Sequence, residues 1–362
     1  MKTVEIMDYI TEQPEILRNI VENRKEILKD FIAAYQANKV SKIILTGSGS
    51  SYNASVSSRH FIEKLLKVET HVEFAYTFNK HLHVFSRDTL VFSLSQSGES
   101  TAAVHCLEKA NQLELLSVAV TSQDDSLITE YAKNKIIVPS GEEKAGATTK
   151  GYTSTVLTLY LMAIETAYQT DLLHEEKYKQ YISQLKAIIG NMGKSIEAAE
   201  EWYKEHKEEL LSASNYIVTG YGDNYGTAME GGLKFLETSR VPVSVYELEE
   251  FMHGPYNAID ENSYIFFIGT PGDGKERMMK LVEYFSSKTP HGYVITKKSE
   301  CHTPGSLAID FIDDEDLSPI EYIVPLQVLF FRTAKDRGVN MRTPRYVDFH
   351  PYMNSKRRLR FL

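Results

Sequence analysis

The chain has 362 residues, of which 42% are hydrophobic and 25% are charged, a composition typical of a globular protein with two or three domains. Its net charge of −9 argues against a general nucleic-acid-binding protein, which presents a basic face. No apolar run reaches the length of a membrane span, the first residues lack the apolar core of a signal peptide, and two cysteines are too few for a secreted disulfide framework. We therefore expect a cytoplasmic protein without a membrane or nucleic-acid partner.

The first half of the chain has the pattern of alternating strands and helices. Residues 1–36 are helical in pattern, and we expect a break at Pro14. Residues 42–50 (KIILTGSGS) form an apolar run that ends in glycine and serine, and a helical segment follows. Residues 88–100 (DTLVFSLSQSGES) form a second such run that stops at a loop of small residues. This order predicts a βαβ unit.

The second half repeats this plan. Residues 216–226 (YIVTGYGDNYG) match the first run, with Gly220 equivalent to Gly47, and residues 262–274 match the second. The repetition predicts an α/β fold built from two tandem domains, each a parallel sheet flanked by helices in a flavodoxin-like αβα sandwich. Residues 154–211 are helical in pattern and connect the copies.

The predicted organisation has four parts. These are an N-terminal helical segment (1–34), a first domain with its connecting helices (35–190), a second domain (195–335) and an irregular tail (336–362) that ends in the basic sequence KRRLR.

A cluster of hydroxyl side chains in the first copy indicates an anion site. Residues 95–101 (SQSGEST) follow a strand and precede a helix, where serine hydroxyls and backbone amides can hold a phosphate. The loop has no lysine, which fits a sugar monophosphate better than a metal-bound triphosphate. Any single serine can instead be a simple helix N-cap. The equivalent loop of the second copy, residues 269–272, lacks the serines, so we expect one phosphate site per chain.

A dinucleotide-binding fold is the alternative interpretation of the glycine loops. Gly47 and Gly49 follow a strand, but Tyr52 stands where the third glycine is needed. In the second copy the third glycine comes one residue late, at Gly226. We consider this alternative much weaker than a sugar-phosphate site.

Acid–base candidates occur in the second copy. Glu230, Lys234 and Glu237 are spaced to share one helix face, although an exposed Glu–Lys pair would show the same spacing. His253 precedes a Gly-Pro pair and is expected on a turn. If Glu237 and His253 meet, the carboxylate can move a proton between sugar carbons 1 and 2 while the imidazole opens the ring. No histidine pair has convincing metal spacing, so we expect no metal and no cofactor.

Five motifs in order resemble the sugar isomerase (SIS) family, in particular the double-SIS isomerase portion of glucosamine-6-phosphate synthases. They lie at residues 47–59, 93–100, 145–153, 228–237 and 250–255 (GSGSSYNASVSSR, SLSQSGES, AGATTKGYT, AMEGGLKFLE and EFMHGP). The resemblance extends from about residue 6 to about residue 335.

The resemblance implies roles for individual residues. Glu237 would be the proton-shuttling base, and His253 the ring-opening residue, supplied by the partner subunit of a homodimer with its active site at the subunit interface. Gly146 and Thr148 would line the sugar. The residues expected to bind substrate are Ser50, Ser51, Ser95, Gln96, Ser97, Ser100, Thr148, Glu230 and Lys234.

Two departures from the synthase pattern bear on the reaction. The glutamine-hydrolysing half and its N-terminal cysteine are absent from the sequence, so we do not expect synthesis of glucosamine 6-phosphate from glutamine. The synthases have a Schiff-base lysine shortly after a Pro-Arg pair, whereas here Phe349 stands at that place after Pro344-Arg345 and Lys356 comes too late. We therefore expect a fructosamine 6-phosphate deglycase. The alternatives are an amino-sugar 6-phosphate deaminase or isomerase, and a non-catalytic SIS module that senses a sugar phosphate.

Overall fold

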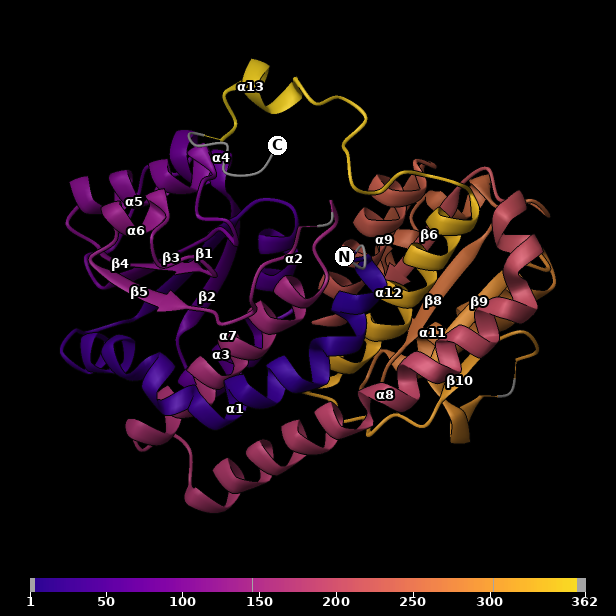
Figure 1. Cartoon of the computed structure of the whole chain (residues 1–362). Helices are drawn as coiled ribbons and strands as arrows, with labels where there is room; N and C mark the ends of the chain where they lie inside the picture. Colours follow the sequence, from indigo (N-terminus) through magenta and orange to yellow (C-terminus); the bar gives the residue numbers. More distant parts are fainter. Residues whose placement is uncertain (1–3, 145, 302, 357–362) are drawn as a thin grey trace. The chain divides into compact units, whose positions relative to one another are not determined.

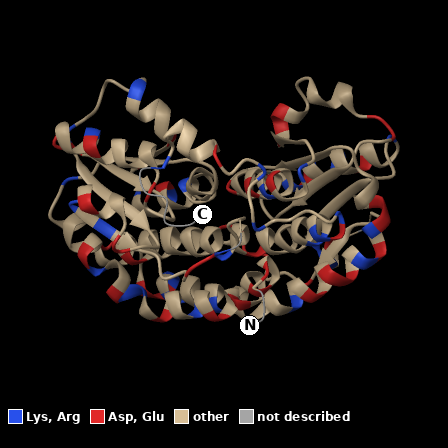
Figure 2. Ribbon diagram, turned by 45° about the horizontal axis from the view of Figure 1, so that its top comes forward, with Lys and Arg blue, Asp and Glu red and all other residues tan. Residues whose placement is uncertain are grey.

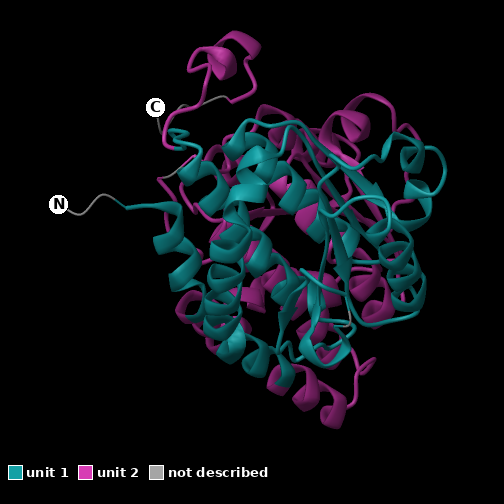
Figure 3. Ribbon diagram, turned by 90° about the vertical axis from the view of Figure 1, so that its right-hand side faces the viewer, with its two compact units in different colours: residues 1–14, 184–341 teal, residues 15–183, 342–362 magenta. Residues whose placement is uncertain are grey.

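The computed structural model describes residues 4–144, 146–301 and 303–356 (Figure 1). The chain divides into two compact units, and both are discontinuous in sequence (Figure 3). Unit 1 contains residues 1–14 and 184–341, and unit 2 contains residues 15–183 and 342–362. Each unit contains one five-stranded sheet.

The sheet of unit 2 has the strand order β2-β1-β3-β4-β5, with all neighbouring strands parallel. Its strands are β1 (Lys42–Gly47), β2 (Glu69–Phe74), β3 (Thr89–Leu94), β4 (Leu116–Thr121) and β5 (Asn134–Ile137). The helices of this half are α2 (Ser50–Val56), α3 (Arg59–Leu66), α4 (Ala75–Lys80), α5 (Thr101–Gln112), α6 (Leu127–Tyr131) and α7 (Lys150–Gln169).

The sheet of unit 1 has the order β10-β9-β8-β6-β7, again with parallel neighbours. Its strands are β6 (Tyr216–Gly220), β7 (Val243–Glu247), β8 (Ile265–Gly269), β9 (Gly292–Lys297) and β10 (Leu307–Ile309). The helices are α9 (Asn224–Ser239), α10 (Leu248–Phe251), α11 (Lys275–Ser286) and α12 (Ser318–Asp336), with 3₁₀ turns at Pro255–Ala258 and Lys298–Glu300. When the order is given starting from β7, it matches the strand order of the first sheet starting from β2. This match confirms the predicted duplication and the α/β fold.

The strands form because their side chains are buried on both faces. Every residue of β3 and β8 is buried, as expected for parallel strands covered by helices on each side. In unit 2, α7 is buried along almost its whole length and packs against α2 and α3. None of the described helices is long and apolar enough to cross a membrane.

The long helices α1 (Ile6–Gln36) and α8 (Glu175–Ser212) are each continuous. The predicted break at Pro14 is wrong, because α1 runs through it. A proline removes the amide that would bond to the carbonyl four residues earlier, and here the Gln13 side-chain amide donates to that carbonyl, of Ile10, at 3.2 Å. Buried side chains also continue at helical spacing past the proline, for example at Leu17 and Val21.

Basic and acidic residues are interspersed along the helices (Figure 2). The tail was expected to be irregular, but it contains one short helix, α13 (Phe349–Met353). Of the terminal basic sequence only Lys356 lies within the described residues.

Candidate active site

The loop after β3 is held in shape by backbone hydrogen bonds. The Ser95 amide donates to the Val120 carbonyl (2.9 Å), and the Ser122 amide donates to the Gln96 carbonyl (3.0 Å). Gly98 turns the chain with a φ of +69°, and its amide donates to the Ser95 carbonyl at 3.0 Å. The loop therefore has a fixed path at the carboxyl end of the sheet, where open α/β sheets bind their ligands.

The predicted phosphate ligands lie in unit 2 after the neighbouring strands β1 and β3; two of them begin α2, and the others lie in the loop after β3. They are Ser50, Ser51, Ser95, Gln96, Ser97 and Ser100. Ser100 is also the N-cap of α5, and its hydroxyl accepts a hydrogen bond from the Ala103 amide at 3.4 Å. The simple capping interpretation therefore holds for this serine, and the case for an anion site rests on the cluster as a whole.

A carboxylate that the sequence motifs did not reveal fixes two of the predicted ligands. Glu143 accepts hydrogen bonds from the amides of residues 149–151 at 2.8–3.1 Å, and from Gln96 Nε2 at 2.8 Å. Gln96 Oε1 in turn accepts from the Thr148 hydroxyl at 2.9 Å. Gly151 leaves the space for this network, because a Cβ there would lie 1.9 Å from Gln96 Nε2. Glu143 thus caps α7 and holds Gln96 and Thr148 in place.

Sequence reasoning missed Glu143 because it lies 47 residues from Gln96, the side chain that it contacts. An available indication was an acidic residue shortly before the start of a helix, where a carboxylate is favoured. Gly146, the other predicted sugar-lining position, is exposed in the same loop.

The acid–base candidates on α9 share one face, as predicted, and this face is largely buried. The Lys234 and Glu230 side chains are 3% and 1% exposed, with Nζ 3.5 Å from Glu230 Oε1. Lys234 Nζ also donates to Glu237 Oε1 at 2.6 Å, and the Glu237 side chain is 34% exposed. The alternative of an exposed surface pair is therefore wrong. The enclosed Lys234, which also pairs with Glu230, therefore holds the Glu237 carboxylate in a position that is partly exposed to solvent.

Two adjacent glycines let α9 pack closely within unit 1. A Cβ at Gly231 would lie 2.7 Å from Leu326 of α12, and a Cβ at Gly232 would lie 2.3 Å from Val245 of β7. This close packing explains why the sequence has a Gly-Gly pair inside a helix, where glycine costs about 1 kcal/mol relative to alanine.

His253 lies on the turn after α10, as predicted, and its side chain is exposed. Its amide donates to the Glu250 carbonyl at 3.1 Å. Within the described part of the chain, no hydrogen bond or ion pair joins His253 to Glu237. Glu237 and His253 belong to unit 1 and the phosphate ligands to unit 2, so their combination into one active site remains a prediction.

The second copy's loop after β8 has a tyrosine packed over it. The Tyr221 hydroxyl donates to the Thr270 carbonyl, and a Cβ at Gly274 would lie 2.5 Å from the Tyr221 ring. Burial raises the pKa of Tyr221 to about 12. An aromatic ring therefore occupies the space next to this loop, and the expectation of one phosphate loop per chain stays a prediction.

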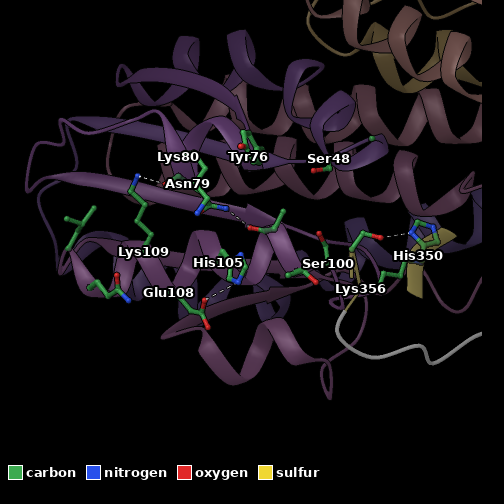
Figure 4. Close-up of a pocket in the computed structure, with 16 residues that line it drawn as sticks. Ser48, Tyr76, Asn79, Lys80, Ser100, His105, Glu108, Lys109, His350 and Lys356 are labelled. Carbon is green, nitrogen blue, oxygen red and sulfur yellow. Dashed lines mark hydrogen bonds and ion pairs between the residues drawn. The ribbon is translucent and has the colours of Figure 1, made fainter. Parts of the chain in front are cut away.

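A pocket of about 1030 Å³ lies beside the hydroxyl-rich loop of residues 95–101, within unit 2 (Figure 4). It is bounded by α4, the outward side of α5 and residues of the C-terminal tail. Ser48, Ser100 and Thr101 connect its wall to the loops that carry the phosphate ligands. Among the described residues, no group of three or more His, Cys, Asp or Glu side chains could hold a metal ion.

Fold and site together define a duplicated parallel α/β protein with one hydroxyl-rich loop and one enclosed Lys–Glu pair. Comparison with known families then assigns the family. The chain belongs to the SIS domain family, whose model matches residues 37–165 and 209–304.

Individual relatives agree with this assignment. The chain is 26% identical over 345 residues to the isomerizing glutamine–fructose-6-phosphate aminotransferase of Caldanaerobacter subterraneus subsp. tengcongensis, which covers 93% of the chain and 57% of the relative. The chain thus spans little more than half the length of the curated relatives it matches.

Solved structures are similar over nearly the whole chain. A crystal structure from Clostridium difficile 630, described as a candidate phosphosugar isomerase, has a TM-score of 0.89 and 29% identity, covering 98% of this chain and 99% of that one. The C-terminal domain of the glucosamine-fructose-6-phosphate aminotransferase from Francisella tularensis has a TM-score of 0.85 and 23% identity, covering 94% and 98%. The latter likeness concerns the fold alone.

Proposed function

We propose that the chain is an enzyme that acts on a fructosamine 6-phosphate and releases an aldose 6-phosphate and a free amine. The observation that carries this proposal is the position of Glu237. Its carboxylate is held by the enclosed Lys234 ammonium at 2.6 Å and remains one-third exposed, as a base that meets a substrate must be.

The chemistry requires two proton transfers, one between carbons 1 and 2 and one between the amine nitrogen and the carbon-2 oxygen, and one water for hydrolysis. In the open-chain substrate, carbon 1 carries the amine and carbon 2 is a ketone. Glu237 removes a proton from carbon 1 while the carbon-2 oxygen takes up a proton from solvent, which gives an enaminol. Glu237 then returns its proton to carbon 2 while the amine nitrogen loses its proton to solvent, which leaves an imine at carbon 1 and a hydroxyl at carbon 2. Water hydrolyses the imine to the aldehyde and the amine. The hydroxyl loop of unit 2 would hold the phosphate and orient the reacting carbons.

The tail supports a substrate that already carries nitrogen. Phe349, at the place where the family resemblance puts a Schiff-base lysine, is the first residue of α13 and is 54% exposed. A phenylalanine cannot capture a keto sugar covalently. A ketosamine needs no such capture, because its amine is already bonded to carbon 1.

A paired turnover assay tests the proposal. Purified protein receives fructoselysine 6-phosphate and related ketosamine phosphates in one set, and glucosamine 6-phosphate in the other. We expect glucose 6-phosphate and free amine from the first set. Ammonia and fructose 6-phosphate from the second set would instead identify a deaminase. Sugar-phosphate binding with no turnover in either set would identify a sensor.

We expect Glu143→Gln to raise KM about tenfold while lowering kcat less, because a glutamine offers one acceptor oxygen in place of two and turns an amide donor toward other donors. Gln96 and Thr148 then lose their fixed positions. The matched control is Glu142→Gln, which changes the neighbouring exposed glutamate. An unchanged KM in the Glu143 variant would show that the network only stabilises the loop.

We also propose that the enzyme is a homodimer in which His253 serves the partner's site. Its exposed position on a turn suits a residue that acts outside its own chain. Light scattering should give twice the chain mass of 41.2 kDa at micromolar concentration. A monomeric, fully active protein would contradict this arrangement.

A further inference from the structure

The C-terminal tail docks on the phosphate loop within unit 2. The Thr101 amide donates to the Ser355 carbonyl at 3.1 Å, and the Thr101 hydroxyl donates to the Asn354 carbonyl at 2.9 Å. Ser100 and Lys356 form an antiparallel bridge directly beside these bonds. Asn354 ends α13 with a φ of +50°, which turns the chain toward the loop. The tail therefore reaches the loop by main-chain contacts at a defined register.

This docking brings a cation to a loop that has none. Residues 95–101 contain no lysine or arginine, and their one charged residue is Glu99. Lys356 and His350 line the same end of the pocket as Ser100 (Figure 4). Within the described residues, Lys356 forms no ion pair with a carboxylate. Two basic side chains beside a cluster of hydroxyls form a site complementary to a dianion.

The His350 ring is held at the same end of the pocket as Lys356 and Ser100. Its Nδ1 lies 2.7 Å from the Ser355 hydroxyl, so the turn at the end of the tail fixes the ring. Burial, and then the nearby positive charge of Lys356, lower the pKa of His350. An anion between the two groups would relieve their repulsion.

The other lysines of the pocket do not serve this purpose. Lys109 Nζ donates to the carbonyls of Phe78, Asn79 and Leu82 at 2.6–3.2 Å, so its ammonium closes the C-terminal end of α4. Lys80 lies on α4, at the other end of the pocket from Ser100 in Figure 4. Lys356 is the pocket lysine whose backbone pairs with the phosphate loop.

We propose that Lys356 is the cationic ligand of the substrate phosphate, delivered by the tail to a loop that has no lysine or arginine of its own. The inference rests on the proposed function of this loop as a sugar-phosphate site. It assigns the tail lysine to the phosphate end of the substrate and not to its carbonyl carbon.

Three variants test this assignment. Lys356→Met keeps the length of the side chain but removes its charge, Lys356→Arg keeps the charge, and Lys133→Met removes one exposed charge elsewhere in unit 2. We expect the Kd for glucose 6-phosphate, measured by calorimetry, to rise about three- to tenfold in Lys356→Met, the range expected for one solvent-accessible charge-assisted hydrogen bond. Lys356→Arg and Lys133→Met should bind as the unaltered protein does.

Salt dependence and turnover separate this role from a structural one. Raising the ionic strength should weaken glucose 6-phosphate binding less in Lys356→Met than in the unaltered protein. KM should rise while kcat is held. Equal affinities in the Met variant and the unaltered protein would overturn the inference and leave the proposed function standing. An unaltered protein that neither binds nor turns over sugar phosphates would overturn the proposed function, and the inference with it.

Discussion

Replacing Glu237 by glutamine is expected to lower kcat at least about 100-fold, because general base catalysis contributes about 10²–10⁴ to the rate. The amide oxygen can still accept the hydrogen bond from Lys234, which now spans 2.6 Å, so the helix face should keep its geometry. Calorimetry should show glucose 6-phosphate binding within about twofold of the unaltered protein, since the phosphate ligands belong to other loops.

A control variant makes this result interpretable. Glu261→Gln changes an exposed glutamate of the same unit and should leave kcat and KM unchanged. If the Glu237 variant turns over at the unaltered rate, another group must be the base, and the proposed reaction loses its main support. If it loses binding together with turnover, Glu237 has a structural role.

Replacing Gly98 by alanine is expected to destabilise the protein by about 2–5 kcal/mol and to weaken phosphate binding. A φ of +69° costs an L-residue about 1–2 kcal/mol. The new Cβ would also lie 2.0 Å from the Ser126 hydroxyl oxygen and 2.2 Å from its Cβ, an overpacking that typically costs about 1–3 kcal/mol. Urea unfolding gives the free energy of unfolding, and calorimetry gives the Kd for glucose 6-phosphate.

Another glycine with a positive φ, in the other unit, supplies a control for this prediction. Gly222 follows β6 in the second copy with a φ of +54°, and no atom lies within 4 Å of a Cβ placed there. Gly222→Ala should therefore show only the backbone cost, about 1–2 kcal/mol. Equal losses in the two variants would mean that the loop shifts away from Ser126 at little cost.

Much of the fold could be predicted because the same strand–loop–helix pattern occurs in both halves of the sequence. The two strand–glycine–helix patterns around Gly47 and Gly220 predicted parallel sheets, and the two observed sheets have corresponding strand orders. The helix break at Pro14 was predicted from local chemistry alone. It failed because a neighbouring glutamine side chain satisfies the carbonyl that proline leaves without a donor.

The candidate site was less accessible to sequence reasoning, because its contacts are distant along the chain. Helical spacing was enough to place Lys234 beside Glu237, three residues away. No local pattern connects Gln96 with Glu143, or Thr101 with Asn354, a residue 253 positions later. Such pairs depend on where loops come together after folding, and motifs that list each segment separately do not contain that information.

The order in which the units are interleaved along the chain has a consequence for biosynthesis. The ribosome synthesises the whole sheet of unit 2 before any strand of unit 1, but residues 342–356 follow only after the strands of unit 1 have been synthesised. Because nascent domains generally fold as they emerge, the first sheet would be formed well before Lys356 arrives. A growing polypeptide would then pass through a stage with a folded hydroxyl loop and no tail cation, and it would bind sugar phosphates weakly until the tail has been synthesised.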